Sequence, residues 1–235
     1  MDPIRQGDIV RLESDRLADV AAGATLTGPV PSCPEWTLGD LVRHVHEVHE
    51  FWHAVVTRPL LTGDDVDAFE QGRGEPPPDD VVVERFRAGA QAFASDLAAA
   101  DPHQPCWTWG ASQNAGFVQR FQVQEASIHR ADAELAAGLP ISPMQTDAAL
   151  DGLGVLCEVL APWVKEPPAP VVLLPSEDAA NPRVLFGAAA DAVATVHGRA
   201  SDLVYVAWRR LPLDTVEVSG DRAAAEAALA AIDGS

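Results

Sequence analysis

The chain has 235 residues, of which 47% are hydrophobic, and its formal net charge is -19. This length and composition are typical of a globular protein with one or two domains, and they exclude a largely disordered chain. The excess of negative charge disfavours nucleic acid and anionic lipid as partners, because both would be repelled.

Simple sequence patterns predict the cellular location of the protein and the redox state of its cysteines. The N-terminal segment 1–8 lacks a basic stretch followed by an apolar one, and no apolar run approaches about eighteen residues, so we expect a cytoplasmic protein without a membrane span. The cysteines Cys33, Cys106 and Cys157 have no short spacing, which disfavours a disulfide framework and a Cys-rich zinc module and predicts free thiols. We also expect a monomer.

Helical periodicity dominates the first half of the chain. It predicts a first helix over about 8–22, followed by a proline-rich loop over 29–36. Thr37 and Asp40 have the spacing of a capping box and predict the start of a second helix, which runs to about residue 56. The buried stripe of this helix is predicted to comprise Leu41, Val45, Val48, Trp52 and Val55.

Two more helices are predicted before residue 140. A long acidic connection over 58–79, of a kind that is often functional or mobile, leads to a third helix over about 80–100. A fourth helix over about 114–137 follows a loop. The core candidates of the third helix are Val82, Phe86, Phe93 and Leu97.

The pattern changes in the last third of the chain. Ser142 and Pro143 read as the N-cap and first residue of another helix, and the prolines over 162–170 predict a domain linker. We therefore expect a helical domain over 1–165 and a small α+β domain over 170–235. The second domain is predicted to contain strands at 171–174, 183–186, 192–196 and 215–218 and helices at 201–210 and 221–232.

The fourth helix holds a carboxylate and an imidazole one turn apart. Glu125 and His129 share a face with Phe121 and Ile128. A carboxylate in an apolar stripe is costly to bury unless its charge is compensated, and the nearby histidine indicates a metal ion. Taken alone, Glu125 can also be a partly exposed helix residue.

His44, in the apolar stripe of the second helix, is the candidate third ligand; alone, it can also be a core histidine satisfied by a hydrogen bond. Facing helices of a bundle project side chains into a shared core, so His44, Glu125 and His129 would form two imidazoles and one carboxylate. With an open position this set is typical of catalytic zinc, and non-haem iron uses the same ligand types. Asp132 would either accept a hydrogen bond from an imidazole or form a simple salt bridge.

Three further histidines lie on another face of the second helix. His46, His49 and His53 share this face with Glu50 at helical spacing. The pattern permits a second metal trio, but a solvated polar face is the interpretation that we favour.

Two motifs carry a resemblance to a known family. The segment VPSCPEWTLGDLVRHV over 30–45 looks like a Pro-x-Cys-Pro-x-Trp turn followed by Asp-Leu-x-x-His, and the second motif is Glu125-x-x-x-His129-x-x-Asp132. The chain thus resembles the mycothiol-dependent maleylpyruvate isomerase-like proteins, whose N-terminal domain is a DinB-like four-helix bundle. The resemblance implies that His44, Glu125 and His129 bind a divalent metal, usually zinc.

The C-terminal part extends the resemblance. The segment over 198–210 looks like the family's Gly-x-Ala-x-Asp-Leu and Trp-Gly-Arg pattern, although Arg209 stands where glycine is usual. Arg210 matches the family's arginine, and we predict that it anchors an anionic substrate in a cleft between domains; the alternative is an arginine that contacts the last carbonyls of a helix. Trp36, Trp107 and Trp109 are candidates to line this cleft, although for Trp36 we favour packing in the core.

The resemblance implies a metal- and thiol-dependent enzyme. A coordinating thiol ionises readily, and the thiolate of mycothiol or a similar cofactor is a nucleophile suited to isomerase or S-transferase chemistry on a small electrophile. A metal- or small-molecule-binding protein without turnover is the alternative from another class. A hydrolase that uses metal-bound water is a third hypothesis, for which no partner base is evident beside the motif.

Overall fold

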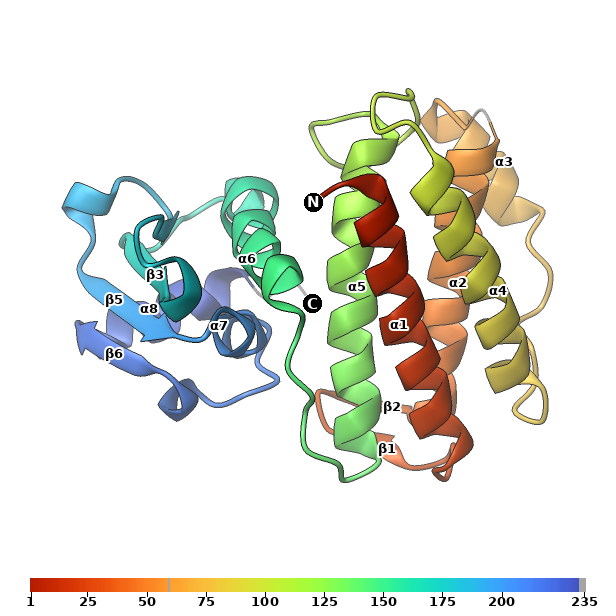
Figure 1. Ribbon diagram of the computed structural model, residues 1–235, viewed down its shortest axis with the longest axis horizontal. Coiled ribbons are helices and arrows are strands. Elements are labelled where there is room, and N and C mark those ends of the chain that lie inside the picture. Colours follow the sequence, from red (N-terminus) through yellow and green to blue (C-terminus); the bar gives the residue numbers. More distant parts are fainter. Residues whose placement is uncertain (59, 233–235) are drawn as a thin grey trace. The chain divides into compact units, whose positions relative to one another are not determined.

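The computed structural model describes residues 1–58 and 60–232, and its contacts divide the chain into two units, Met1–Ser142 and Pro143–Ser235. The first unit is mostly helical, and the second is built around a four-stranded sheet (Figure 1). The predicted class, a helical domain followed by a small α+β domain, is confirmed.

The boundary between the units lies earlier than the sequence predicted. The expected domains were 1–165 and 170–235, whereas the contacts assign α6 (Thr146–Val155) to the second unit. The reason is that α6 packs against α7 (Ala200–Ala207), so it belongs to the core of that unit despite its position before the prolines.

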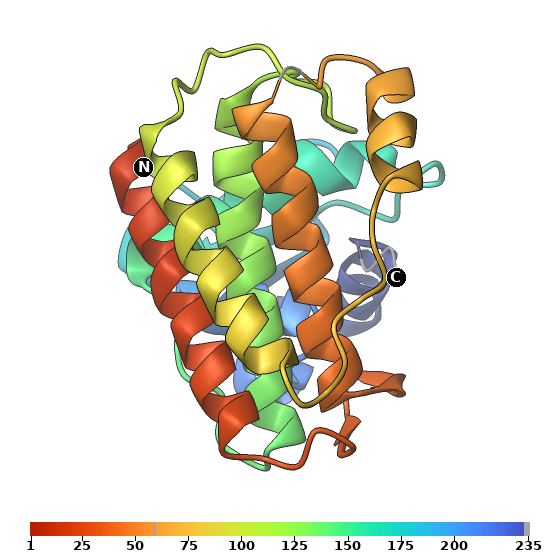
Figure 2. The same ribbon diagram turned by 90° about the vertical axis from the view of Figure 1, so that its right-hand side faces the viewer.

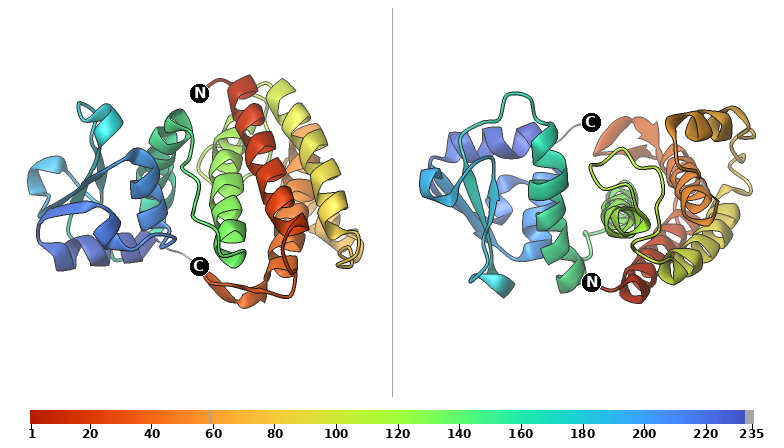
Figure 3. Two further views of the ribbon diagram at one scale, coloured as in Figure 1. Left: turned by 60° about the horizontal axis from the view of Figure 1, so that its bottom comes forward. Right: turned by 90° about the horizontal axis from the view of Figure 1, so that it is seen from above.

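The first unit is a bundle of four long helices among the described residues, which lie side by side (Figures 1 and 2). They are α1 (Pro3–Ala22), α2 (Leu38–Thr57), α4 (Val82–Ala99) and α5 (Ala115–Ala136). α1 and α2 each contact both α4 and α5. The right panel of Figure 3 shows the bundle from one end. α2 and α5 are therefore neighbours. The predicted core residues of the third helix, now α4, are all fully buried: Val82, Phe86, Phe93 and Leu97.

Side-chain caps determine where the helices begin. Asp2 accepts a hydrogen bond from the backbone N–H of Arg5 at 2.9 Å, so α1 begins earlier than predicted. α2 begins as predicted, because Thr37 Oγ1 accepts from the N–H of Asp40 at 3.2 Å and the Asp40 carboxylate accepts from the N–H of Thr37 at 2.9 Å. His44 follows about two turns later, so this cap sets its position.

Two segments that were predicted as irregular contain regular structure. The proline-rich segment is a hairpin of β1 (Pro29–Val30) and β2 (Cys33–Thr37), which is too short for an alternating pattern to reveal. The acidic connection contains α3 (Gly63–Gln71), which starts with a second capping box, formed by Thr62 and Asp65. Because α3 buries none of its residues, no apolar stripe marks it in the sequence.

A buried ion-pair network links α1 to α5. Arg130, which is 1% exposed, donates through Nε to Glu13 at 2.6 Å and through Nη1 to Glu134 at 2.7 Å. The backbone N–H and the hydroxyl of Ser142 each donate to Glu134 at 2.8 Å. Ser142 is therefore not the N-cap of a helix, as the sequence predicted, and α6 begins only at Thr146.

The second unit is built on a sheet with the strand order β4–β3–β5–β6, in which β3 and β5 are parallel and the other pairs antiparallel. α7 and α8 both contact β3 and β5. Every predicted strand and helix of this unit is present, with ends shifted by a few residues. The bounds are Val171–Pro175 for β3, Arg183–Leu185 for β4, Ala194–Gly198 for β5, Glu217–Gly220 for β6 and Arg222–Ile232 for α8. Between α6 and β3 the chain forms a π-helical turn over Leu156–Leu160 and a 3₁₀ turn over Ala161–Trp163.

The structure also bears on the cysteines and on membrane insertion. Cys33, Cys106 and Cys157 are thiols, as predicted. Burial raises the pKa of Cys106 to about 11 and that of Cys157 to about 12, so neither is an activated nucleophile. Throughout the described residues, no helix has the length and apolarity that a membrane span requires.

Replacing Thr37 by alanine should lower the free energy of unfolding by about 1 kcal/mol, because the N–H of Asp40 loses its acceptor. Urea denaturation followed by circular dichroism measures this change. Thr62→Ala is the matched control, since it removes the same motif from α3, which buries no residue and can fray without unfolding the bundle. Equal losses in the two variants would contradict a special role for Thr37.

Candidate metal centre

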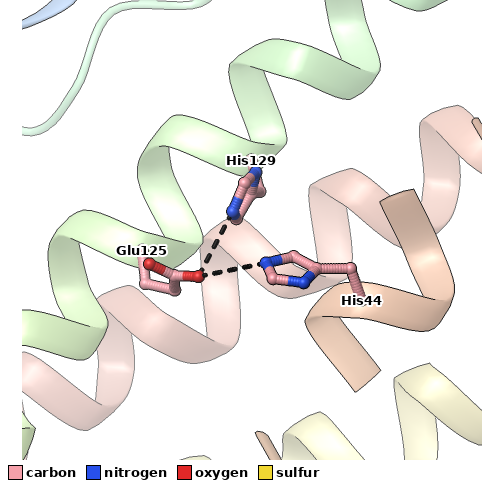
Figure 4. A group of neighbouring side chains, drawn as sticks. All are labelled: His44, Glu125 and His129. Atoms are coloured by element: carbon pink, nitrogen blue, oxygen red, sulfur yellow. Dashed lines mark ion pairs between the residues drawn. The ribbon is translucent and has the colours of Figure 1, made fainter. Parts of the chain in front are cut away.

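Three side chains from two neighbouring helices converge between α2 and α5 (Figure 4). His44 comes from α2, and Glu125 and His129 lie one turn apart on α5. His44 Nε2 lies 3.6 Å from Glu125 Oε1, and His129 Nε2 lies 3.2 Å from the same oxygen. The structure thus brings together the three residues that the sequence predicted as ligands.

The separations between these atoms suit a metal ion. Ligand atoms about 2.1 Å from a tetrahedral ion lie about 3.4 Å from one another, which is close to the two observed distances. The side chains of His44, Glu125 and His129 are 35%, 19% and 12% exposed, so solvent reaches the group. Two imidazoles and one carboxylate could hold a divalent ion and leave a position open. Among the residues that the structure describes, this is the one such group of three or more ligands.

The charge of Glu125 dominates the electrostatics of the group. Burial works against its charged form, but His129 and His44 outweigh burial and hold the pKa of the carboxyl below its usual range. Burial also disfavours a charged His129, whereas Glu125 and then Asp132 raise the pKa of this imidazole to about 9. Glu125 therefore lies against a positive charge, which a bound cation could supply in place of the imidazolium.

Asp132 fixes the orientation of His129. Its side chain is fully buried, and its Oδ2 lies 2.9 Å from His129 Nδ1. Nδ1 thus faces Asp132 and Nε2 faces Glu125. A neutral ring that keeps its proton on Nδ1 would present Nε2 as a ligand atom. The contact fits both alternatives for Asp132, a hydrogen bond from the imidazole and an ion pair with it, so the role of Asp132 beside a metal ligand stays a prediction.

Ser32, which no sequence pattern singles out, makes a polar contact beside this group. Its hydroxyl donates to Asp132 Oδ1 at 2.5 Å across a hundred positions of sequence. It lies in the turn between β1 and β2, inside the first of the two motifs that carry the family resemblance. No local pattern connects residues so far apart, so only their occurrence in the two motifs could have indicated the contact.

Trp36 adjoins the candidate metal centre. Its ring lies 4.7 Å from the ring of His44, and its side chain also packs against the bundle core. Trp36 is thus partly buried against the core, and the same ring limits the space around His44.

Trp107 and Trp109 occupy different surroundings. Trp107 stacks on Trp52 of α2, with ring centroids 6.2 Å apart. Trp109 packs edge-on against Phe117 and Phe121 at the start of α5, at 5.1 Å and 5.0 Å. A role of either tryptophan in binding a substrate or a thiol stays a prediction.

Arg210 lies in the second unit, after the end of α7. Its Nη1 donates to the carbonyl of Trp208, the C-cap of α7, at 2.7 Å. This contact is the one expected of an arginine at a helix end, and a role of Arg210 as a substrate anchor stays a prediction. The preceding Arg209 has a φ of 56°, in the left-handed region that favours glycine, which is the usual residue at this position in the family that the sequence resembles.

The histidine-rich face of α2 is not the solvated polar face that was predicted. His46 and His49 are buried, at 7% and 1% exposed. The reason is that α4 covers this face: the ring of His49 lies 5.6 Å from Phe86 and 5.0 Å from Phe93. His53 remains partly exposed. Polar residues on a covered face are the exception that an amphipathic pattern cannot reveal.

His49 is a buried base without a local partner. Neither ring nitrogen makes a hydrogen bond within the described part of the chain. Burial lowers its pKa to about 3, against a smaller opposing effect of Glu125 and with smaller contributions from His46, His129 and His44. The ring is therefore neutral at pH 7.

Two family models match the chain. Residues 10–134 match the model described as the mycothiol maleylpyruvate isomerase N-terminal domain, and residues 147–227 match the model described as the MDMPI C-terminal domain. The matched regions lie on either side of the structural boundary after Ser142.

Solved structures with the same fold include that of the mycothiol-dependent maleylpyruvate isomerase, with a TM-score of 0.67, and that of a histidine-to-alanine mutant of this isomerase, with a TM-score of 0.68. Each is 14% identical in sequence, and each comparison covers 94% of this chain and 95% of the other. No curated protein matches the chain.

Replacing His49 by leucine should reduce the sensitivity of the fold to acid. The unfolded chain takes up a proton at His49 below its ordinary pKa of 6.5, whereas the folded chain does so only near 3, so stability falls as the pH drops between these values. The wild type should lose roughly 1 kcal/mol more per pH unit than the variant. Urea denaturation of both proteins at pH 7 and pH 5, with a chelator present, measures the difference.

His53→Leu, on the partly exposed end of the same helix face, is the control and should behave like the wild type. The role of His49 would be refuted if His49→Leu and the wild type lost the same free energy of unfolding on acidification.

Proposed function

This chain belongs to the mycothiol maleylpyruvate isomerase family, and on that basis we propose that it is a metal- and thiol-dependent enzyme. The cofactor would be mycothiol or a similar low-molecular-weight thiol, which reacts as the thiolate. Addition of the thiolate to an activated alkene, rotation about the new single bond and loss of the thiolate would give a cis–trans isomer. Addition or displacement without that loss would give an S-transferase product.

The observation that carries this proposal is the convergence of His44, Glu125 and His129 between two helices. These are the residues to which the family resemblance assigns a metal. A divalent metal held there would bind a thiol sulfur and favour its ionisation. We propose zinc, since two imidazoles and one carboxylate with an open position are typical of catalytic zinc sites.

Residues around the three ligands would hold them in place. Asp132 would keep the proton of His129 on Nδ1 and its Nε2 facing Glu125. Ser32 would keep the Asp132 carboxylate from turning away, because it donates to the oxygen that His129 does not use. Trp36 would restrict the rotation of His44, since the two rings are in contact.

Further expectations from the sequence are part of the same proposal. Arg210, Trp107 and Trp109 are proposed to bind the substrate or the thiol. A cytoplasmic location and a monomeric state also stay predictions.

Removal of a ligand should remove the metal. Glu125→Ala and His44→Ala should each reduce bound zinc from near-stoichiometric to background, because the remaining two ligands cannot hold the ion. Metal analysis by mass spectrometry after gel filtration measures the content. Full occupancy in both variants would refute the site.

His53→Ala is the control for this experiment. His53 lies on α2 like His44, but its Nε2 lies 2.6 Å from Asp96 Oδ2 on α4, and it is not part of the metal group. His49→Ala is a poorer control, because His49 is buried and its truncation would leave a cavity in the core.

A thiol titration separates an enzyme from a binding protein. In protein loaded with Co²⁺, mycothiol should produce a sulfur-to-metal charge-transfer band, and the metal-free protein should produce none. If the metal binds and no thiol changes the spectrum, the thiol-dependent function is wrong and a metal- or small-molecule-binding protein is the remaining interpretation.

A further inference from the structure

A cavity of about 330 Å³ lies beside the candidate metal centre, between α2 and α3. α3 runs alongside α2 in Figures 1 and 2. His44 is both a member of the metal group and part of the cavity wall. A molecule with one end at the metal centre could therefore extend into this cavity. Its volume is at the lower end of the range of about 300–1,000 Å³ for small-molecule pockets, so it suits part of a cofactor.

The charged groups in the wall disfavour an anion. Arg73 Nη2 lies 2.7 Å from Glu70 Oε1, and Arg73 Nη1 lies 3.9 Å from Glu47 Oε2. The guanidinium also lies over the ring of Phe69, 5.5 Å from its centroid. The positive charge is thus already balanced by two carboxylates, and a carboxylate or phosphate entering the cavity would meet surplus negative charge.

The same groups suit hydroxyls. The carboxylates of Glu47 and Glu70 are 34% and 45% exposed and can accept hydrogen bonds from hydroxyl groups, and the Arg73 guanidinium can donate to them. Phe51 and Trp52 add aromatic surface to the wall. Aromatic surface beside fixed acceptors and donors is suited to a ring that is apolar on its faces and polar at its edge.

Neighbouring aromatic rings support Phe51 and Trp52 in the cavity wall. Trp52 stacks on Trp107, and Phe51 lies edge-on to Trp107 with ring centroids 5.9 Å apart. Phe51 also contacts Phe69 of α3, at 6.0 Å. Trp107 does not line the cavity itself, and it supports the two rings that do.

We propose that this cavity binds an uncharged, hydroxyl-rich group attached to the thiol, while the sulfur lies at His44, Glu125 and His129. The inference rests on the proposed function, because the thiol would connect the two places. It assigns the recognition of the cofactor to α3 and Arg73, within the connection that the sequence marked only as long and acidic.

Filling the cavity tests this inference. Val66 lines the cavity from α3, a helix without buried residues, so Val66→Trp can occupy the space without disturbing the core. The probes are mycothiol, whose cysteine is attached to sugar and cyclitol rings, and 2-mercaptoethanol, which lacks them. In calorimetric titrations of zinc-loaded protein, Val66→Trp should bind mycothiol at least about tenfold more weakly and bind 2-mercaptoethanol and zinc as the wild type does.

A variant that keeps the shape of the cavity is the second test. Glu70→Gln removes the charge of one acceptor and should weaken mycothiol binding several-fold, with 2-mercaptoethanol unaffected. Glu75→Gln, an exposed glutamate beyond α3 that does not line the cavity, is its matched control and should change neither affinity.

The outcomes separate this inference from the proposed function. Unchanged mycothiol affinity in Val66→Trp, or equal weakening of both thiols, would overturn the cavity assignment and leave the thiol-dependent function standing. If the wild type bound neither thiol, the proposed function and the cavity assignment would both be overturned.

Discussion

A partly buried carboxylate requires positive charge close by, and the arrangement around Glu125 follows from that requirement. His129 meets it from the same helix, one turn away, and His44 meets it from the neighbouring helix α2. Both distances depend on how α2 and α5 are positioned. The capping box at Thr37 sets the first residue of α2, and the amide N–H of Phe117 donates to the Asn114 side chain at the start of α5.

α5 carries two polar networks on different faces, one of them buried and the other partly buried. Toward α1, Arg130 bridges Glu13 and Glu134. Toward the hairpin, Asp132 connects His129 to Ser32. Because leaving such groups unsatisfied is costly, each network selects one rotation of α5 about its axis. That rotation is the one in which Glu125 and His129 face α2.

How much of this structure the sequence predicts depends on how far apart in the sequence the interacting residues lie. The cap of α2, the core of α4 and the one-turn spacing of Glu125 and His129 are local, and sequence patterns revealed them. The hairpin and α3 could not be predicted from the sequence, because neither has a periodic apolar pattern. The burial of His49 could not be predicted from the sequence either, because it depends on α4, which covers a polar face of α2.

The sequence by itself determined the helical bundle, the small α+β unit and the identity of the three candidate ligands. The reason is that periodicity, caps and the two motifs each involve residues that are close together in the sequence. Only the tertiary structure decided that Ser32 reaches Asp132, that α6 belongs to the second unit and that a cavity lies between α2 and α3. Each of these depends on which helices become neighbours, and that choice is made by packing over the whole chain.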